Sequence, residues 1–151
     1  MPKASSHVSA TEPGERLFLD LSKIKNPEAL KSMGKSNWLM IVDETTKSKF
    51  SSFHETKNEM INPTCTFVGK LKNKDINAKV IRCYNDGENK SLEKITNGKY
   101  WRMAIQFECT ARATPQQNVA IETGFAHILN KAKAMMIDDN VPCLIRCKIM
   151  Q

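Results

Sequence analysis

The sequence has few of the residues that build zinc sites or disulfide frameworks. It has three histidines and an odd set of five cysteines without a Cys-x-x-Cys pair. This usage is typical of reduced thiols in a cytosolic or nuclear protein rather than of a secreted disulfide scaffold. His127, Cys143 and Cys147 match no zinc-binding spacing. We therefore do not expect structural zinc.

Long apolar runs are also missing. No run approaches the roughly 20 residues of a membrane span, and the first six residues lack the apolar centre of a signal peptide. We therefore expect a soluble intracellular protein, cytoplasmic or nuclear, that is not secreted and has no membrane partner.

The composition is that of a globular protein. Of the 151 residues, 40% are hydrophobic and 26% are charged, which allows one domain with its own core. Residues 1–15 are rich in Ser, Thr, Pro and Gly and are predicted to be a flexible lead-in, and residues 16–151 to be the domain. The net charge of +7 favours a polyanionic partner, but the lysines are scattered along the chain, so a solvated surface explains the charge equally well.

Apolar patterns predict three strands at the start of the domain. They cover residues 16–22, 37–43 and 48–53, and polar connections between them favour antiparallel neighbours. The first strand carries Asp20 among leucines and a phenylalanine, where an unpaired charge is costly. Asp20 is therefore interpreted either as a turn cap or as a metal ligand or catalytic acid. Asp43, where strand meets turn, is interpreted as turn-forming.

Helices and strands alternate in the rest of the chain. A helix with Asn62 as N-cap and Pro63 as first residue is predicted to run to about Asn73. We then expect a strand over 78–83, a helix over 91–101 with Leu92, Ile95 and Trp101 inward, a strand over 104–108, a helix over 116–138 and a partial helix over 139–151. Crossovers of this length imply parallel pairing to an earlier strand.

The long helix over 116–138 has apolar residues at helical spacing, which predicts a buried stripe. The stripe consists of Ile121, Phe125, Ile128, Leu129, Ala132, Met135 and Met136. Glu122 flanks it near the helix start, where the helix dipole alone would favour an acid. Core packing explains the methionines more simply than an interface does.

Four sequence blocks resemble the integrase catalytic core of copia-type retrotransposons. They are residues 14–22, 38–43, 81–89, and 113–118 followed by Glu122. The Thr-Pro-Gln-Gln-Asn segment with its later glutamate is the most specific block, and the resemblance covers about residues 12–150. It implies an α/β domain of ribonuclease H-like fold, with a mixed central sheet and helices on both faces. We expect a core truncated on its C-terminal side, from a longer polyprotein or a decayed copy.

The resemblance also implies a chemistry. In this family three carboxylates hold two Mg²⁺ or Mn²⁺ ions, which activate the attacking hydroxyl and stabilise the leaving oxygen during DNA cleavage and strand transfer. By position, Asp20 matches the first acid and Glu122 the third, and both would be metal ligands. DNA is the implied partner. The residues implied to contact it are Asn85, Gln117, Asn118 and Lys131.

The second acid is replaced. The family pattern Asp-Asn-x-Gly-Glu reads Tyr84-Asn-Asp-Gly-Glu here. Tyrosine is neutral at pH 7 and offers one phenolic oxygen where a carboxylate offers two. Asp86 is a candidate surrogate, but two residues along an extended chain displace a side chain by roughly 6–7 Å. We therefore expect a weakened or absent metal site.

Two further departures concern DNA binding. Position 119, often glycine in the family, is Val119, and the basic residues expected beyond the glutamate are Thr123 and Gly124. Three interpretations follow: a catalytically defective integrase core, an active polynucleotidyl transferase that uses Asp86, and a non-enzymatic module that forms a homodimer or binds nucleic acid.

Overall fold

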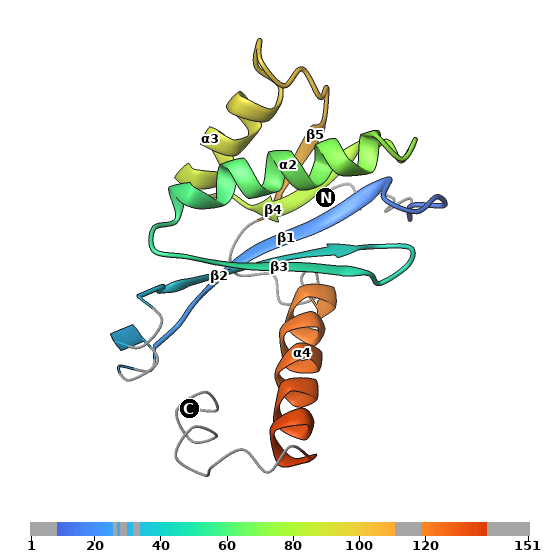
Figure 1. Ribbon diagram of the computed structural model, residues 1–151. Coiled ribbons are helices and arrows are strands. Elements are labelled where there is room, and N and C mark those ends of the chain that lie inside the picture. The colour runs from blue at the N-terminus through green and yellow to red at the C-terminus, as the bar shows by residue number, and fades with distance from the viewer. Residues whose placement is uncertain (1–8, 26, 28–29, 32–33, 111–118, 139–151) are drawn as a thin grey trace, which may run out of the picture.

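The computed structural model describes residues 9–25, 27, 30–31, 34–110 and 119–138. Five strands and three longer helices organise this part of the chain (Figure 1). Their bounds, in chain order, are β1 Arg16–Lys23, β2 Asn37–Asp43, β3 Lys49–His54, the 3₁₀ turn η1 Asn58–Met60, α2 Ile61–Lys72, β4 Val80–Tyr84, α3 Gly87–Thr96, β5 Gln106–Thr110 and α4 Val119–Asp138.

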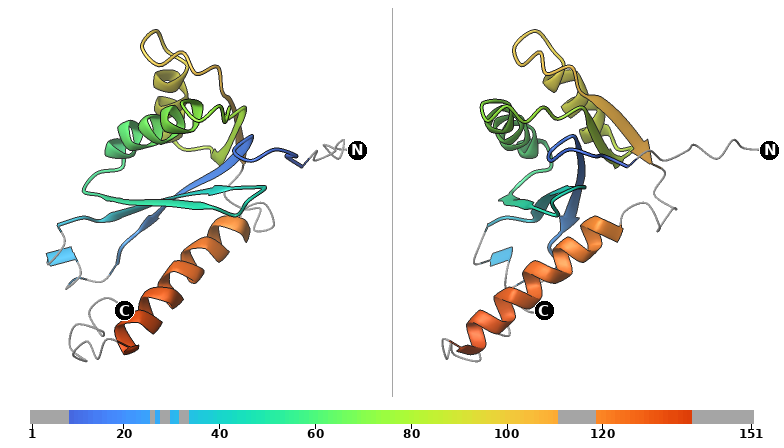
Figure 2. Two further views of the ribbon diagram at one scale, coloured as in Figure 1. Left: turned by 45° about the vertical axis from the view of Figure 1, so that its right-hand side comes forward. Right: turned by 90° about the vertical axis from the view of Figure 1, so that its right-hand side faces the viewer.

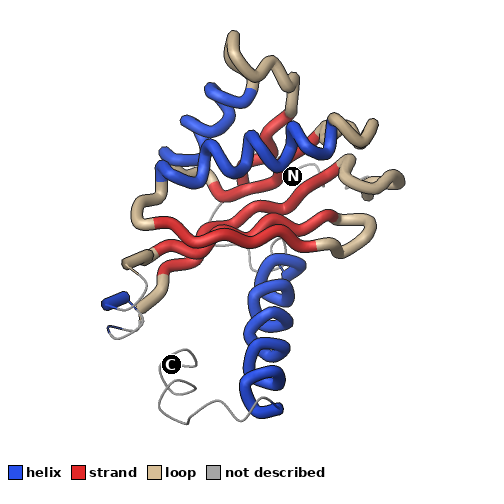
Figure 3. Tube along the Cα trace, viewed as in Figure 1, coloured by secondary structure: helices blue, strands red, loops and turns tan. Residues whose placement is uncertain are grey.

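The strands form one mixed sheet in the order β3-β2-β1-β4-β5 (Figure 3). β1, β2 and β3 pair antiparallel, as the polar connections between them predicted. β4 pairs parallel to both β1 and β5, as expected from the helical crossovers. The predicted α/β architecture, with three antiparallel strands followed by strand–helix alternation, is confirmed.

Each face of the sheet has its own apolar core. α2 and α3 lie on one side and α4 lies on the other (Figures 1 and 2). Strand alternation explains the division, because successive side chains point to opposite faces. The core under α2 and α3 includes Leu17, Leu19, Leu39, Ile41, Ile81, Cys83 and Leu92. The core under α4 consists of Phe18, Trp38, Met40, Val42 and Ile121, with Phe125 and Ile128 packed against it.

The turn after β2 depends on Asp43. Its buried carboxylate accepts hydrogen bonds from the backbone N–H groups of Gly14, Thr45 and Thr46. The turn-forming role predicted for Asp43 is confirmed. The contact with Gly14 also holds the end of the segment predicted to be a flexible lead-in, and Gly14 adopts φ +75°, a conformation that glycine favours.

The start of α2 differs from the prediction. The helix begins at Ile61, and η1 runs directly into it, so Met60 rather than Asn62 is the N-cap residue. Pro63 is then the third helical residue. It is tolerated there because the first four N–H groups of a helix have no partner within the helix.

α3 begins earlier than predicted. It starts at Gly87 and ends at Thr96, whereas the sequence pattern suggested residues 91–101. The shift changes the inward face: Leu92 is buried as expected, but Ile95 is 41% exposed. Trp101 lies beyond the helix and is partly buried.

α4 is buried along only part of its predicted apolar stripe. Ile121 is fully buried, but Leu129 is 37% and Met135 is 65% exposed. The prediction that these two side chains are buried was therefore wrong. The reason is geometric, since Figure 1 shows α4 leaving the sheet as it runs toward its C-terminal end. In the part of the chain that the structure describes, no helix has the length and apolar character to cross a membrane.

Candidate active site

Asp20 stands on the sheet face that α4 covers. Phe18 on the same strand belongs to the core under α4, and strand alternation puts Asp20 on the same side. The paired register of β1 and β4 ends at Phe18 opposite Arg82, whose guanidinium lies 5.7 Å from the Phe18 ring centroid. Two residues further along each strand are Asp20 and Tyr84. Parallel pairing therefore brings the first-acid and second-acid positions to the same end of the sheet.

Two other carboxylates act on that of Asp20. Asp20 is half-buried, and burial raises the pKa of its carboxyl above the ordinary value of 3.8. The negative charges of Asp86 and Glu122 raise this pKa further, Asp86 having the larger effect of the two. A hydrogen bond of 2.7 Å from the Leu21 N–H to Asp20 Oδ1 acts in the opposite direction. Asp86 and Glu122, both distant from Asp20 in sequence, are thus within electrostatic reach of it.

Asp86 is positioned by α3. It is the N-cap residue, with extended backbone at φ −107° and ψ 158°. Its N–H donates to the Tyr84 carbonyl at 2.9 Å, so the chain turns sharply between β4 and α3. The early start of α3 therefore makes residue 86 a helix terminus, where the sequence suggested an open turn.

Glu122 is positioned by the packing of α4. It lies in the first turn and is exposed, while its neighbour Ile121 is buried under the helix. Phe125 anchors the next turn through an edge contact with Trp38, with ring centroids 4.7 Å apart. These contacts place the start of α4 over β1 and β2.

Tyr84 is the last residue of β4 and is half-buried. Its carbonyl oxygen also accepts a hydrogen bond of 2.7 Å from Asn89 Nδ2. Asn89 is only 8% exposed, and it fixes the first turn of α3 to the end of β4. Sequence reasoning did not single out Asn89. Its bond to the Tyr84 carbonyl is a tertiary contact that no sequence pattern marks.

The other predicted contact residues are dispersed. Asn85 is exposed, and its N–H donates to the Thr110 carbonyl at 3.2 Å. Lys131 is exposed on α4, nine residues after Glu122, which corresponds to about 13 Å along a helix axis. Gln117 and Asn118 lie outside the described residues, as do Cys143 and Cys147.

A two-metal site makes specific demands on the side chains at these positions. Hard divalent cations need several converging oxygen ligands. Within residues 9–110 and 119–138, gaps excepted, no three His, Cys, Asp or Glu side chains are arranged to hold a metal ion. Tyr84 brings a phenol to the position where the family has a carboxylate. We call Asp20, together with Asp86 and Glu122 whose charges act on it, the acidic neighbourhood.

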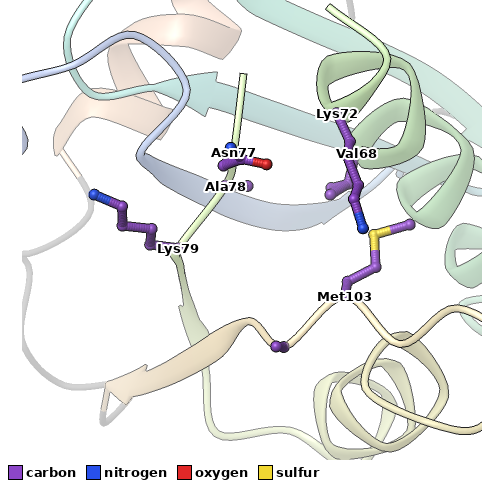
Figure 4. Close-up of a pocket in the computed structure, with 7 residues that line it drawn as sticks. Val68, Lys72, Asn77, Ala78, Lys79 and Met103 are labelled. Atoms are coloured by element: carbon purple, nitrogen blue, oxygen red, sulfur yellow. The ribbon is translucent and has the colours of Figure 1, made fainter. Parts of the chain in front are cut away.

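One pocket lies away from these acids, beside the first residues of β4. It has a volume of about 210 Å³ and is lined by Val68, Lys72, Asn77, Ala78, Lys79, Met103 and Ala104. Figure 4 shows Lys72 and Met103 reaching toward each other, whereas Lys79 points away. Lys79 instead pairs with Glu15 at 2.9 Å. The pocket contains no acid and is separate from the candidate site.

Comparison with known proteins identifies the fold. No family model and no curated protein matches the sequence. A chain of the cryo-EM structure of the simian T-cell lymphotropic virus intasome, in complex with the PP2A regulatory subunit B56 gamma, matches with a TM-score of 0.60 and 14% identity. The match covers 89% of this chain and 45% of that chain. The present chain therefore has an integrase-like fold, consistent with the ribonuclease H-like type, and spans less than half of the matched protein.

Proposed function

We propose that this chain is the catalytic core of a copia-type retrotransposon integrase that still binds nucleic acid and has lost most or all metal-dependent strand transfer. The integrase-like fold and the four sequence blocks support the family. We infer the loss of strand transfer from one observation: Tyr84 stands at the end of β4, the position at which the family has its second carboxylate.

The chemistry of Tyr84 explains the loss. A phenol offers one oxygen where a carboxylate offers two, and it lacks the negative charge with which a carboxylate neutralises a divalent cation. Without the metals, the charges of Asp86 and Glu122 act on Asp20 only as repulsion, which is the direction in which its pKa is shifted. Mg²⁺ and Mn²⁺ are therefore expected to bind weakly or not at all.

A second candidate function is a working polynucleotidyl transferase in which Asp86 replaces the missing acid. One observation favours it: of the two acids that raise the pKa of Asp20, Asp86 has the larger effect. Against it stands the N-cap position of Asp86, because its backbone is set by α3 and the turn that Asn89 holds. A catalytic constellation tolerates displacements of only about 0.5 Å.

A comparison of variants separates these two functions. Strand cleavage and strand transfer on short DNA duplexes would be measured with Mg²⁺ and Mn²⁺ for wild type, Tyr84→Asp and Tyr84→Phe. The phenylalanine variant is the matched control, since it keeps the ring and removes only the hydroxyl. We expect activity in Tyr84→Asp alone.

The same assay can also refute the proposed catalytic defect. Equal metal-dependent activity in wild type and Tyr84→Asp, abolished by Asp20→Ala and by Asp86→Asn, would refute the defect and establish the Asp86 mechanism. Metal binding by calorimetry gives a second measurement that does not depend on turnover. It should detect Mn²⁺ binding to Tyr84→Asp and little to wild type.

DNA binding is tested separately. Exposed lysines on the helices that flank the acids, Lys90 on α3 and Lys131 on α4, are candidates for phosphate contacts. If charge drives the contact, affinity must fall steeply as salt rises, with a slope that decreases by about one for each lysine removed. Affinity without salt dependence would contradict this role. Light scattering of the free chain tests the homodimer alternative.

A further inference from the structure

Two cysteines are direct neighbours across the parallel pair β4 and β5. Cys83 is the register partner of Cys109, so the two side chains leave neighbouring strands on the same face of the sheet. Neighbouring strands lie about 4.7–4.9 Å apart. That spacing is inside the range of about 4.4–6.8 Å between the Cα atoms of a disulfide. The two backbones are therefore already positioned for a bridge.

The two thiols differ in access to solvent. Cys83 is 3% exposed and belongs to the core under α2 and α3, whereas Cys109 is exposed on β5 at an edge of the sheet. Cys65, the other cysteine in the described residues, is buried and contacts Thr96. One accessible thiol beside one protected thiol is the arrangement of a reactive cysteine with a resolving partner.

We propose that Cys83 and Cys109 are a redox modification site that forms a reversible disulfide between β4 and β5, with hydrogen peroxide as the oxidant. Cys109 Sγ attacks one peroxide oxygen, the O–O bond breaks, and a sulfenic acid and one water form. Cys83 Sγ then attacks the oxidised sulfur, the S–O bond breaks, and a second water leaves. Both thiol protons end in water, both sulfurs are oxidised and the peroxide is reduced.

The order of attack follows from the environment of each thiol. Burial raises the pKa of the Cys83 thiol, and the neighbouring Cys109 raises it further. Cys83 is therefore a poor first nucleophile, because the thiolate is the reactive form. It can still resolve the sulfenic acid, since the two sulfurs are held side by side and the second step is intramolecular.

The bridge would change the candidate site through the strand ends. Tyr84 and Thr110 follow the two cysteines directly and are themselves register partners. Asn85 continues the contact through its N–H bond to the Thr110 carbonyl. A disulfide between Cys83 and Cys109, one residue before this pair on each strand, would fix β5 to the strand that carries Tyr84. This inference concerns the thiols alone and does not depend on the proposed integrase origin.

Peptide mapping tests the proposal on the wild-type chain. Trypsin cleaves after Lys and Arg and leaves each cysteine in its own peptide, so every pairing has a distinct mass. These peptides are residues 58–70, 83–90, 103–112, 134–146 and 147–148. After mild treatment with hydrogen peroxide, we expect the link between 83–90 and 103–112 to exceed every other link by about tenfold, and to disappear on addition of a reducing agent.

Three comparisons make the result specific. Oxidation in concentrated guanidinium chloride should abolish the preference, because the register no longer exists. Cys109→Ser should remove the link, whereas Cys143→Ser with Cys147→Ser should leave it unchanged. In the reduced folded chain, iodoacetamide should label Cys109 about tenfold faster than Cys83. Oxidation of Cys109 to sulfinic acid, or its pairing with Cys143 or Cys147 in the folded wild type, would overturn the proposal.

Discussion

Gly124 allows α4 to pass close to the sheet, and it provides a sharp test of how the helix packs. A Cβ built at Gly124 would lie 3.2 Å from Val42 Cγ2 and 3.7 Å from Lys49 Cε. The first distance is shorter than the roughly 3.5–4.0 Å at which carbon atoms attract. A side chain at position 124 therefore requires Val42 or α4 to shift by a few tenths of an ångström.

Two effects of Gly124→Ala oppose each other. Alanine favours the helix by about 1 kcal/mol relative to glycine. The contact with Val42 costs a comparable amount, because a shift of a few tenths of an ångström relieves it. We expect the free energy of unfolding to change by less than about 1 kcal/mol. Gly124→Val adds two methyl groups at the same contact, and we expect it to destabilise the chain by about 1–3 kcal/mol.

Denaturant unfolding measures both variants. Ala126→Val is the matched control, because residue 126 is an exposed position of the same helix, and it should cost about 0.5 kcal/mol. Adding Val42→Ala to Gly124→Val should make room for the new side chain and give a coupling energy of about 0.5–3 kcal/mol. If Gly124→Val is no less stable than Ala126→Val, α4 does not rest on Val42 as described.

Three more predictions concern charge and hydrogen bonding. Because burial raises the pKa of Asp20, its ionisation opposes folding as pH rises through the interval above 3.8. Asp20→Asn should therefore have a higher free energy of unfolding than wild type at pH 7. At low pH, where Asp20 is protonated, the two proteins should be equally stable. Urea titrations at the two pH values measure both differences. Asp43→Ala removes the acceptor of the Gly14 and Thr46 N–H groups and should cost about 2–4 kcal/mol in the same titration. Asn97→Ala breaks two bonds of 2.7 Å to the Ile105 backbone and should lower the unfolding free energy by about 1–3 kcal/mol.

The first three strands could be predicted to within one residue because their pattern is local, whereas β4 and β5 begin two residues later than predicted. β2 occupies the predicted residues 37–43, since a continuous apolar run buried on both faces admits little else. α3 could not be predicted in the same way. Gly87 lies outside the predicted helix over 91–101, yet it begins α3, because the side chain of Asn89 and the Asp86 N–H close the turn on the Tyr84 carbonyl. Those contacts are tertiary and leave no periodic signal.

The sequence predicted which residues make up the candidate site, but it could not predict the distances between them. Parallel pairing of β4 with β1 follows from the crossover rule and brings residues 20 and 84 to one end of the sheet. How far Asp86 lies from Asp20 depends on the start of α3, which the pattern misjudged. The apolar stripe of α4 was likewise visible, but its spacing could not indicate that Met135 is largely exposed.

The separation of the two cores has a consequence for exchange of amide hydrogens. α4 rests on the smaller core formed with β1 and β2, whereas β4, α2 and α3 share the larger one. A helix held by one small cluster can open at a lower free energy than the sheet beneath it. Amides of α4 should then exchange before those of β1, and each opening would carry Glu122 away from Asp20 while Tyr84 and Asp86 stay in place. The contribution of Glu122 to the acidic neighbourhood is thus a property of the docked helix, and amide exchange along α4 would measure how often it is lost.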